Sequence, residues 1–447
     1  MKTINYYLFL CVIILSITSC TDKESFPTLE EEFEGFLYTS TNSSTGNEVL
    51  AMGRNKHGKL TELIHSPFST GDNGDAIKGN FDSQQGMMMV GHYLIVVNAG
   101  ENPLNGSLSV FKADKNKGHL ERIDQDPTTS TVDNCDSKGV RPVSMTHTFA
   151  GGKEWIIVAN QYSNPYYEGS PASLNGSIQN TNLRNLTVFE FDQKTGILKF
   201  NNTDIVYNDG NYGGPVSIGF NSNGDKLAVT TWGVPHLNVS DPDPNVQQPS
   251  RVYVYDFNAG MLTESSVFEE EGISGTIGCS WSNNNNYLYV ANSNVSADKN
   301  NNSITVLQSS DLSKVQNFAT GNNNGHASWT CVSSNNLDFF TSSFTDNFVS
   351  SFKIDQTTNL LEKTLTPNYF RRNGNIPAGD TKDMFQFYDN KLYVSGAVNT
   401  HEISYFQIKG DGNLEEHRHS PFVIPSTANT MSYDNAFLGL TGFEREK

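Results

Sequence analysis

The chain repeats one short signature over most of its length: a turn rich in glycine, asparagine or aspartate, followed by leucine. Successive copies lie 60, 78, 64, 50, 49 and 53 residues apart, and their leucines are Leu60, Leu120, Leu198, Leu262, Leu312, Leu361 and Leu414. Self-similarity at such spacing indicates a repeat architecture, in which each unit buries its apolar face against its neighbours. The signature therefore predicts seven similar units.

Each unit contains the same strand-like segments. In the fourth unit they are residues 216–220, 226–231 and 251–257, and the leucine of the turn opens a fourth segment at residues 262–268. The segments are rich in β-branched and aromatic residues and are bounded by Asn, Gly and Asp, which is typical of short strands joined by turns. Seven repeats of four short antiparallel strands predict an all-β fold, a seven-bladed β-propeller.

The two ends of the repeat region indicate how the ring closes. The first unit begins at Phe36 without an innermost strand before it, whereas residues 436–443 form a strand-like run that belongs to no unit. We expect this C-terminal segment to complete the first blade, which leaves no open sheet edge. The alternative, two stacked β-sandwich domains, would not explain why His-Ser-Pro-Phe at residues 65–68 recurs at residues 419–422. Residues 33–447 are therefore expected to form one propeller.

The N-terminus carries a processing signal. Lys2 precedes a twelve-residue apolar stretch, residues 6–17, which is too short to span a bilayer. Residues 17–20, Ile-Thr-Ser-Cys, resemble the lipobox of bacterial lipoproteins, which implies a signal peptide at residues 1–19, lipidation of Cys20 and an acidic tether at residues 20–32. The expected location is the cell envelope, lipid-anchored in the outer membrane and facing the periplasm or the surface. An ordinary secretory peptide with an incidental cysteine is the alternative.

Charge and missing motifs exclude several functions. With 30 Lys and Arg against 48 Asp and Glu, the net charge is −18, which offers nucleic acid no counter-charge. The sequence has no P-loop, dinucleotide fingerprint or His-Glu-x-x-His motif, so we expect no cofactor and no metal. Cys135, Cys279 and Cys331 remain in the mature chain and allow at most one disulfide. The protein is expected to be a monomer.

Three phrases carry a resemblance to a known family. Residues 223–229 read Asn-Gly-Asp-Lys-Leu-Ala-Val, residues 186–192 lead to the turn at Gly196, and residues 349–355 repeat the same strand and aspartate. The chain resembles the seven-bladed lactonase propellers, which include bacterial 6-phosphogluconolactonases and fungal carboxymuconate-cyclising enzymes. The resemblance implies hydrolysis of a lactone in a pocket on one face of the channel, near the starts of the innermost strands.

The resemblance also implies which residues line that pocket. A lactonase requires a general base and a cation or hydrogen-bond donor for the developing oxyanion. We expect His326 to be the base, Arg141 to hold the oxyanion or a carboxylate, and Asp380 to orient one of them; Gln85 and Lys382 would bind substrate. The structural alternatives are a channel-lining His326 bonded to backbone and an Arg141 bonded to carbonyls between blades.

A second function remains open. Two long insertions, residues 162–185 and 234–250, fall between strands of the third and fourth units, and insertions of this length are often functional. Tyr166, Tyr167 and Trp232 could form an aromatic platform, or they could pack against the neighbouring blade. With such a platform the protein would be a non-catalytic propeller that binds a glycan or an envelope protein.

Overall fold

A computed structural model describes residues 33–446 apart from residues 76–82, 101–105, 162–183, 208–213, 234–248, 272, 274, 294–302, 321–326, 345, 373–379, 397–399 and 428–435. Cys20, Tyr166, Tyr167 and His326 lie outside the described residues, as do the expected signal peptide and tether. The described residues form strands and no helices. Residues Phe33–Lys447 group as one compact unit.

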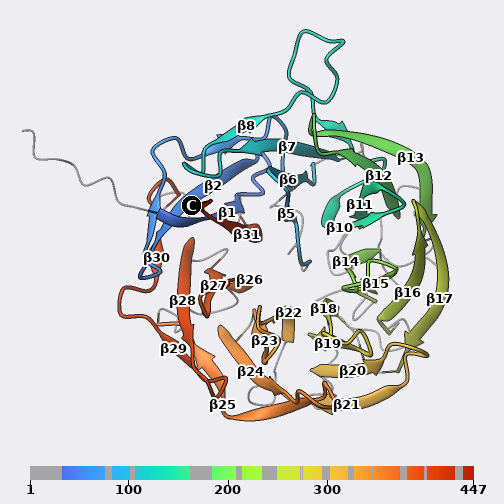
Figure 1. The fold of residues 1–447 in the computed structure, drawn as a ribbon, viewed down its shortest axis with the longest axis vertical. Helices are drawn as coiled ribbons and strands as arrows, with labels where there is room; N and C mark the ends of the chain where they lie inside the picture. The colour runs from blue at the N-terminus through green and yellow to red at the C-terminus, as the bar shows by residue number, and fades with distance from the viewer. Residues whose placement is uncertain are drawn as a thin grey trace, which may run out of the picture. The chain divides into compact units, whose positions relative to one another are not determined.

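The strands form seven antiparallel sheets, the blades, arranged in a ring (Figure 1). From the innermost strand outward, blade 1 contains β31 (Leu438–Glu444), β1 (Phe33–Ser40), β2 (Glu48–Asn55) and β3 (Leu60–Glu62), with β4 (Phe68–Ser69) also on β2. Blade 2 contains β5 (Met87–Val90), β6 (Tyr93–Asn98), β7 (Ser107–Ala113) and β8 (Leu120–Arg122), with β9 (Cys135–Asp136) also on β7. Blade 3 contains β10 (Pro142–Ala150), β11 (Lys153–Asn160), β12 (Asn185–Asp192) and β13 (Ile197–Val206).

The remaining blades follow the same order. Blade 4 contains β14 (Pro215–Phe220), β15 (Lys226–Thr231), β16 (Arg251–Asn258) and β17 (Met261–Glu269), and blade 5 contains β18 (Thr276–Trp281), β19 (Tyr287–Asn292), β20 (Ile304–Gln308) and β21 (Lys314–Phe318). Blade 6 contains β22 (Ala327–Val332), β23 (Asp338–Ser343), β24 (Phe348–Ile354) and β25 (Leu361–Phe370). Blade 7 contains β26 (Thr381–Phe387), β27 (Lys391–Gly396), β28 (Glu402–Ile408) and β29 (Leu414–Glu416), with β30 (Phe422–Val423) also on β28.

The C-terminal strand closes the ring. β31 is the innermost strand of blade 1 and pairs antiparallel with β1, from Gly35 opposite Glu444 to Ser40 opposite Leu438. This pairing joins the two ends of the described chain in one sheet, so blade 1 has its fourth strand. The predicted seven-bladed propeller and its closure by the C-terminal segment are confirmed.

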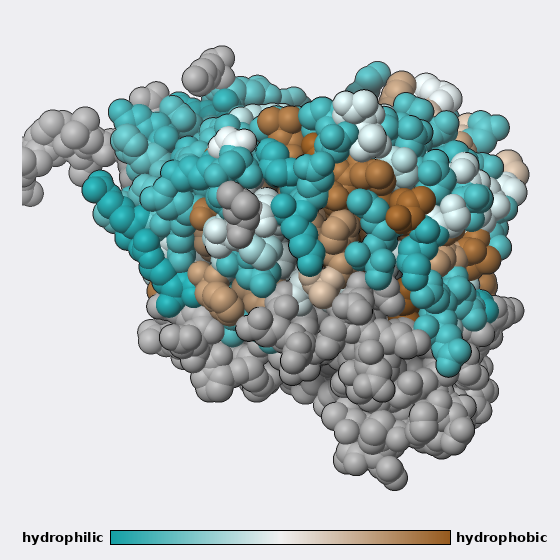
Figure 2. All heavy atoms as spheres, turned by 90° about the horizontal axis from the view of Figure 1, so that it is seen from below, coloured by the Kyte–Doolittle hydropathy of each residue, from teal (hydrophilic) through white to brown (hydrophobic). Residues whose placement is uncertain are grey.

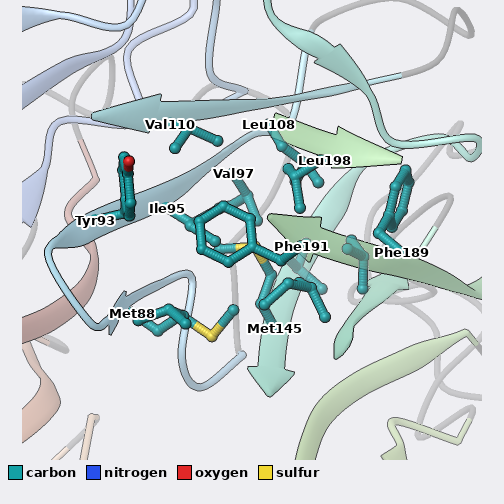
Figure 3. Close-up of a cluster of buried hydrophobic side chains, with 14 of the residues drawn as sticks. Met88, Tyr93, Ile95, Val97, Leu108, Val110, Met145, Phe189, Phe191 and Leu198 are labelled. Carbon is teal, nitrogen blue, oxygen red and sulfur yellow. The ribbon is translucent and has the colours of Figure 1, made fainter. Parts of the chain in front are cut away.

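The core lies between neighbouring blades. The second strands are buried along most of their length, and β6, Tyr-Leu-Ile-Val-Val-Asn, is buried at every position. Its side chains alternate between two clusters, so that Ile95 and Val97 pack toward blade 3 with Met145 and Phe191. Figure 3 shows this cluster filling the space between the two blades. On the side shown in Figure 2, the coloured surface is mostly hydrophilic, with apolar patches between polar side chains.

The repeated turn holds each blade against the one before it. The hydroxyl of Tyr38 in blade 1 donates a 2.9 Å hydrogen bond to the carbonyl of Gly118 in the turn of blade 2. Tyr289 in blade 5 makes the same bond, 2.6 Å long, to Asn359 in the turn of blade 6. Gly118 and Asn359 have φ values of 68° and 60°, a conformation that glycine and asparagine adopt most readily. The turn signature is therefore an inter-blade contact.

Two faces of the propeller need names. The innermost strands all begin at one end of the channel, here the N-face, and end at the other, here the C-face. At the N-face, asparagines tie the strands of a blade together: Asn292 accepts a 2.7 Å hydrogen bond from Thr276 of β18 and donates a 3.0 Å bond to Thr305 of β20. Such ties hold the N-face ends of the strands in fixed positions.

Candidate functional site

Arg141 and Asp380 lie at the N-face, directly before the innermost strands β10 and β26. His326 directly precedes the innermost strand β22 in the chain but lies outside the described residues. Lys382 is the second residue of β26, Gln85 precedes β5, and Trp232 follows β15. The topology therefore places Arg141 and Asp380 at the same end of the channel, where the sequence analysis expected the pocket.

Arg141 is held in a buried ion pair. Its side chain is 6% exposed, and its Nε lies 3.2 Å from Oδ2 of Asp75, which comes from the connection between blades 1 and 2. The backbone N–H of Asp75 donates to Oδ1 of Asn42 in blade 1. Arg141 has a φ of 63°, and its carbonyl accepts the N–H of Gln161. These contacts fix the direction of the guanidinium group.

Asp380 belongs to a second buried network. Its Oδ2 accepts hydrogen bonds from the hydroxyl of Thr400 at 2.5 Å and from Nη1 of Arg371 at 3.3 Å. Arg371 also donates to Glu402 at 3.0 Å, so one guanidinium group faces two carboxylates. Arg141 and Asp380 thus have different ion partners, Asp75 and Arg371.

Lys382 points into the channel. Its Nζ donates a 3.0 Å hydrogen bond to the carbonyl of Phe437 and lies 5.4 Å from the ring centre of Trp329. Trp232 is 3% exposed and packs in an apolar cluster with Trp329, Val216 and Ile277. This position corresponds to the packing alternative for Trp232, because the described contacts bury its ring rather than present it on a loop.

The segment at Gln84, here called the plug, crosses the channel between these groups and the C-face. The backbone N–H of Gln84 donates a 2.8 Å hydrogen bond to Ser217 of blade 4, and its carbonyl accepts one from Ser144 of blade 3. Its side-chain Oε1 accepts two bonds from Thr330 of blade 6, at 2.9 and 3.0 Å. Gln84 thus spans the ring, and Figure 1 shows the chain at β5 reaching toward the middle.

The position of Gln84 across the channel was not expected from the sequence, which placed Gln84 and Gln85 near the start of an innermost strand and gave a binding role to Gln85. Gln85 is exposed, has a φ of 66°, and its carbonyl accepts the N–H of Met145. One signal for the plug is Gly278 on β18, where an added Cβ would lie 2.5 Å from Oε1 of Gln84.

A cavity of about 320 Å³ lies on the C-face side of the plug. It is lined by Gln84, Ser280, Thr330 and Asp383, and it shares Gln85 and Gln386 with a wider mouth of about 560 Å³. Together the two spaces form the C-face cavity.

Asp383 is the charged side chain that lines the inner part of this cavity, whereas His147 and Glu444 line the outer part. Burial raises the pKa of its carboxyl to about 6, against the opposing effect of the Lys382 ammonium group, and Oδ2 accepts the N–H of Gly439 at 3.1 Å. A carboxyl with such a pKa exchanges its proton close to neutral pH.

The described residues show how the cysteines and the possible metal ligands are placed. It contains no group of three His, Cys, Asp or Glu side chains placed to hold a metal ion. Cys135, Cys279 and Cys331 are free thiols, and burial raises the pKa of each to about 12, so they stay protonated. Within the same residues no helix is long and apolar enough to cross a membrane.

Comparison with known proteins gives matches at the level of structure. No protein-family model and no curated protein sequence matches the chain. A protein from Bacteroides fragilis inferred to be a 6-phosphogluconolactonase is similar, with a TM-score of 0.60 and 15% identity over 93% of this chain and 99% of that protein. The periplasmic gluconolactonase of Pseudomonas aeruginosa has a TM-score of 0.56 and 14% identity over 90% and 99% of the two chains.

A third similar structure has a different description. A hypothetical selenium-binding protein from Sulfolobus tokodaii has a TM-score of 0.54 and 8% identity over 93% of this chain and 95% of its own. At these identities the comparisons establish a shared fold. The chain thus shares the seven-bladed propeller fold of these proteins, and its activity must be argued from its own residues.

Proposed function

We propose that the protein hydrolyses a lactone at the N-face of its propeller. The observation that carries this proposal is the placement of Arg141 and Asp380, two charged side chains that directly precede innermost strands and are oriented by buried ion pairs. Groups held in this way need little reorganisation when charge develops in a reaction. The similarity to the Pseudomonas aeruginosa gluconolactonase, which extends over 90% of this chain, supports the choice of a lactone.

Each residue has one role in the proposed reaction. His326 accepts a proton from water as the water oxygen bonds to the lactone carbonyl carbon, and Arg141 stabilises the resulting oxyanion. The ring C–O bond then breaks, the ring oxygen takes the proton from His326, and an open hydroxy acid results. Asp380 orients the catalytic groups, while Lys382 contributes to substrate binding; Gln85 has no role here, because it lines the cavity on the C-face side of Gln84.

A hydrolysis assay with matched variants tests this proposal. The purified protein is assayed in a pH-stat with aldonolactones that carry or lack a phosphate group. His326→Ala and Arg141→Ala should each lower kcat/KM by about a hundredfold or more. His92→Ala and Arg251→Ala change the same residue types at partly exposed positions and should retain activity. Unchanged turnover in Arg141→Ala and His326→Ala would remove both residues from the mechanism.

Arg141→Ala requires a folding control because it leaves Asp75 buried without its ion partner. The double variant Arg141→Met with Asp75→Asn removes both charges and keeps most of the volume. If the double variant melts like the wild type but does not turn over, the loss of activity is chemical. If it regains activity, Arg141 has a structural role only.

We further propose that the protein is a lipid-anchored protein of the cell envelope, attached through Cys20. The proposal is supported by the Ile-Thr-Ser-Cys segment and by the periplasmic location in the name of one similar structure. Metabolic labelling with an alkyne fatty acid should label the wild type but not Cys20→Ala. Labelling of both proteins, or of neither, would contradict the anchor.

The second candidate function is binding without catalysis, to a glycan or an envelope protein. It is favoured by the plugged channel, in which Gln84 and the cluster of Trp232 and Trp329 occupy the space between the two faces. A wild-type protein without activity on any lactone of the panel would support this candidate. It would direct the search to the loops of residues 162–185 and 234–250.

A further inference from the structure

We propose that the C-face cavity is a separate binding site for a small, uncharged, polyhydroxylated ring molecule such as a neutral monosaccharide. Gln84 closes the cavity on its inner side, and Ser334, which is exposed, lies at its outer end. The volumes of about 320 and 560 Å³ fall in the range of small-molecule sites. The site lies on the opposite side of the plug from Arg141, so the proposal does not depend on the proposed hydrolysis.

The inner wall presents hydroxyl and amide groups in fixed positions. The hydroxyls of Ser280 and Thr330 lie 2.8 Å apart and share a hydrogen bond, and Thr330 donates onward to Gln84. These contacts connect blades 5 and 6 through one chain of polar groups, which holds their orientations before a ligand arrives. A ligand with several hydroxyl groups can donate to and accept from such a wall.

Gln386 adds a donor that lacks an acceptor. Its Oε1 accepts the backbone N–H of Ser334 at 2.8 Å, which assigns the other end of the amide as Nε2. Nε2 is buried, and the described residues supply no acceptor for it. A buried donor without a partner destabilises the folded protein. Because Gln386 lines both parts of the cavity, its amide group lies beside the proposed ligand.

The charge of the inner cavity restricts the ligand further. Asp383 is the charged residue among the described side chains that line it, and no lysine, arginine or histidine joins them there. Phosphates and carboxylates would therefore meet a like charge, since the nearby Lys382 ammonium group bonds to the carbonyl of Phe437 and does not line this space. A neutral hydroxyl group, in contrast, can donate to a carboxylate.

The apolar part of the wall suits the face of a sugar ring. Phe385 and Met384 of β26 and Met88 of β5 line the cavity beside the polar groups. The ring of Phe385 is braced by an edge-to-face contact with Phe387, with ring centres 5.0 Å apart. A sugar ring combines C–H faces with hydroxyl edges, so both kinds of surface would be covered.

Binding to the full chain is measured by saturation-transfer NMR and calorimetry. The probes are D-glucose, D-galactose and myo-inositol, with D-glucose 6-phosphate and D-glucosamine as charged counterparts. We expect saturable binding of at least one neutral probe and at least tenfold weaker binding of the phosphate. Preference for glucosamine over every neutral probe would overturn the uncharged ligand, and the absence of saturable binding by any probe would reduce the cavity to a water-filled channel.

Variants locate the site. Asp383→Asn and Ser280→Val should each weaken binding at least tenfold, whereas Asp256→Asn, which changes an exposed carboxylate, should not. The two cavity variants come from different blades, so failure of one to fold leaves the other as the test. Unchanged affinity in both would place the ligand elsewhere. The probes are not lactones, so failure of the hydrolysis assay leaves this result unaffected.

Discussion

The hydroxyl of Tyr393 donates a 2.9 Å hydrogen bond to the carbonyl of Gly58, across a sequence separation of 335 residues. Tyr393 lies on β27 of blade 7 and Gly58 in the turn of blade 1, so the bond crosses the junction where the ring closes. Inside blade 1, β31 from the C-terminal end of the chain pairs with β1 from the N-terminal end. Closure therefore has two components, a strand within blade 1 and a tyrosine that reaches it from blade 7.

Loss of this tyrosine bond should lower stability. Tyr393→Phe keeps the ring in the core and leaves the Gly58 carbonyl without its donor, which should reduce the free energy of unfolding by about 1–3 kcal/mol. Urea denaturation followed by fluorescence measures the change. Tyr388→Phe is the control, because Tyr388 is 83% exposed and should lose nothing measurable. Equal midpoints for the two variants would contradict the role assigned to Tyr393.

Asn292, at the end of β19 in blade 5, should contribute more to the free energy of unfolding than Asn283 in the turn before β19. Asn292→Ala breaks the bonds to both Thr276 and Thr305 and leaves buried hydroxyls unsatisfied, with an expected loss of about 2 kcal/mol. Asn283→Ala, in the exposed turn before β19, should change the unfolding free energy by less than about 0.5 kcal/mol. Thermal unfolding by calorimetry distinguishes the two outcomes, and a destabilisation of equal size in both variants would refute the tie.

The plug should be sensitive to a single methyl group. Gly278→Ala places a Cβ 2.5 Å from Oε1 of Gln84 and 2.9 Å from the N–H of Thr330, so the bond between these two residues must give way. We expect a loss of about 1–3 kcal/mol. Gly219→Ala on the innermost strand of blade 4 is the matched control, because a Cβ there meets nothing within 4 Å. If both substitutions are tolerated alike, Gln84 does not hold the position assigned to it.

Asp383 should make stability depend on pH in the acidic range. Its pKa is raised from 3.8 to about 6, so the folded protein binds the proton more tightly than the unfolded chain does. The stabilisation is therefore complete below pH 3.8 and is lost as pH rises through 6, at about 1.4 kcal/mol for each pKa unit. Asp383→Asn should remove this component and gain stability relative to wild type between pH 4 and 7. Urea titrations across this range test it, and a constant difference between the two proteins would contradict the raised pKa.

The repeat made the architecture predictable because each blade needs the same parts. A strand that is buried on both faces needs apolar residues to fill the space between blades, and a turn that docks on the preceding blade must bring glycine or asparagine to that contact. The recurrence of His-Ser-Pro-Phe has a similar cause. Ser66 donates to Glu62 and Ser420 donates to Glu416, each just before a short extra strand.

The site was less predictable because its contacts do not repeat. Gln84 and Thr330 are 246 residues apart, and nothing in either local sequence marks the other as a partner. The ion partners of Arg141 and Asp380 were missed for the same reason, since Asp75 and Arg371 come from the connections between blades. Sequence position placed Arg141 and Asp380 at one end of the channel, but their neighbours required the folded chain.

The central claim, lactone hydrolysis, is tested most directly by the initial rate at which the wild-type protein opens aldonolactones. We predict saturable turnover of at least one lactone, with an initial rate proportional to protein concentration and well above spontaneous ring opening. A rate that never exceeds spontaneous hydrolysis for any phosphorylated or unphosphorylated lactone, in a protein that unfolds cooperatively, would contradict the claim.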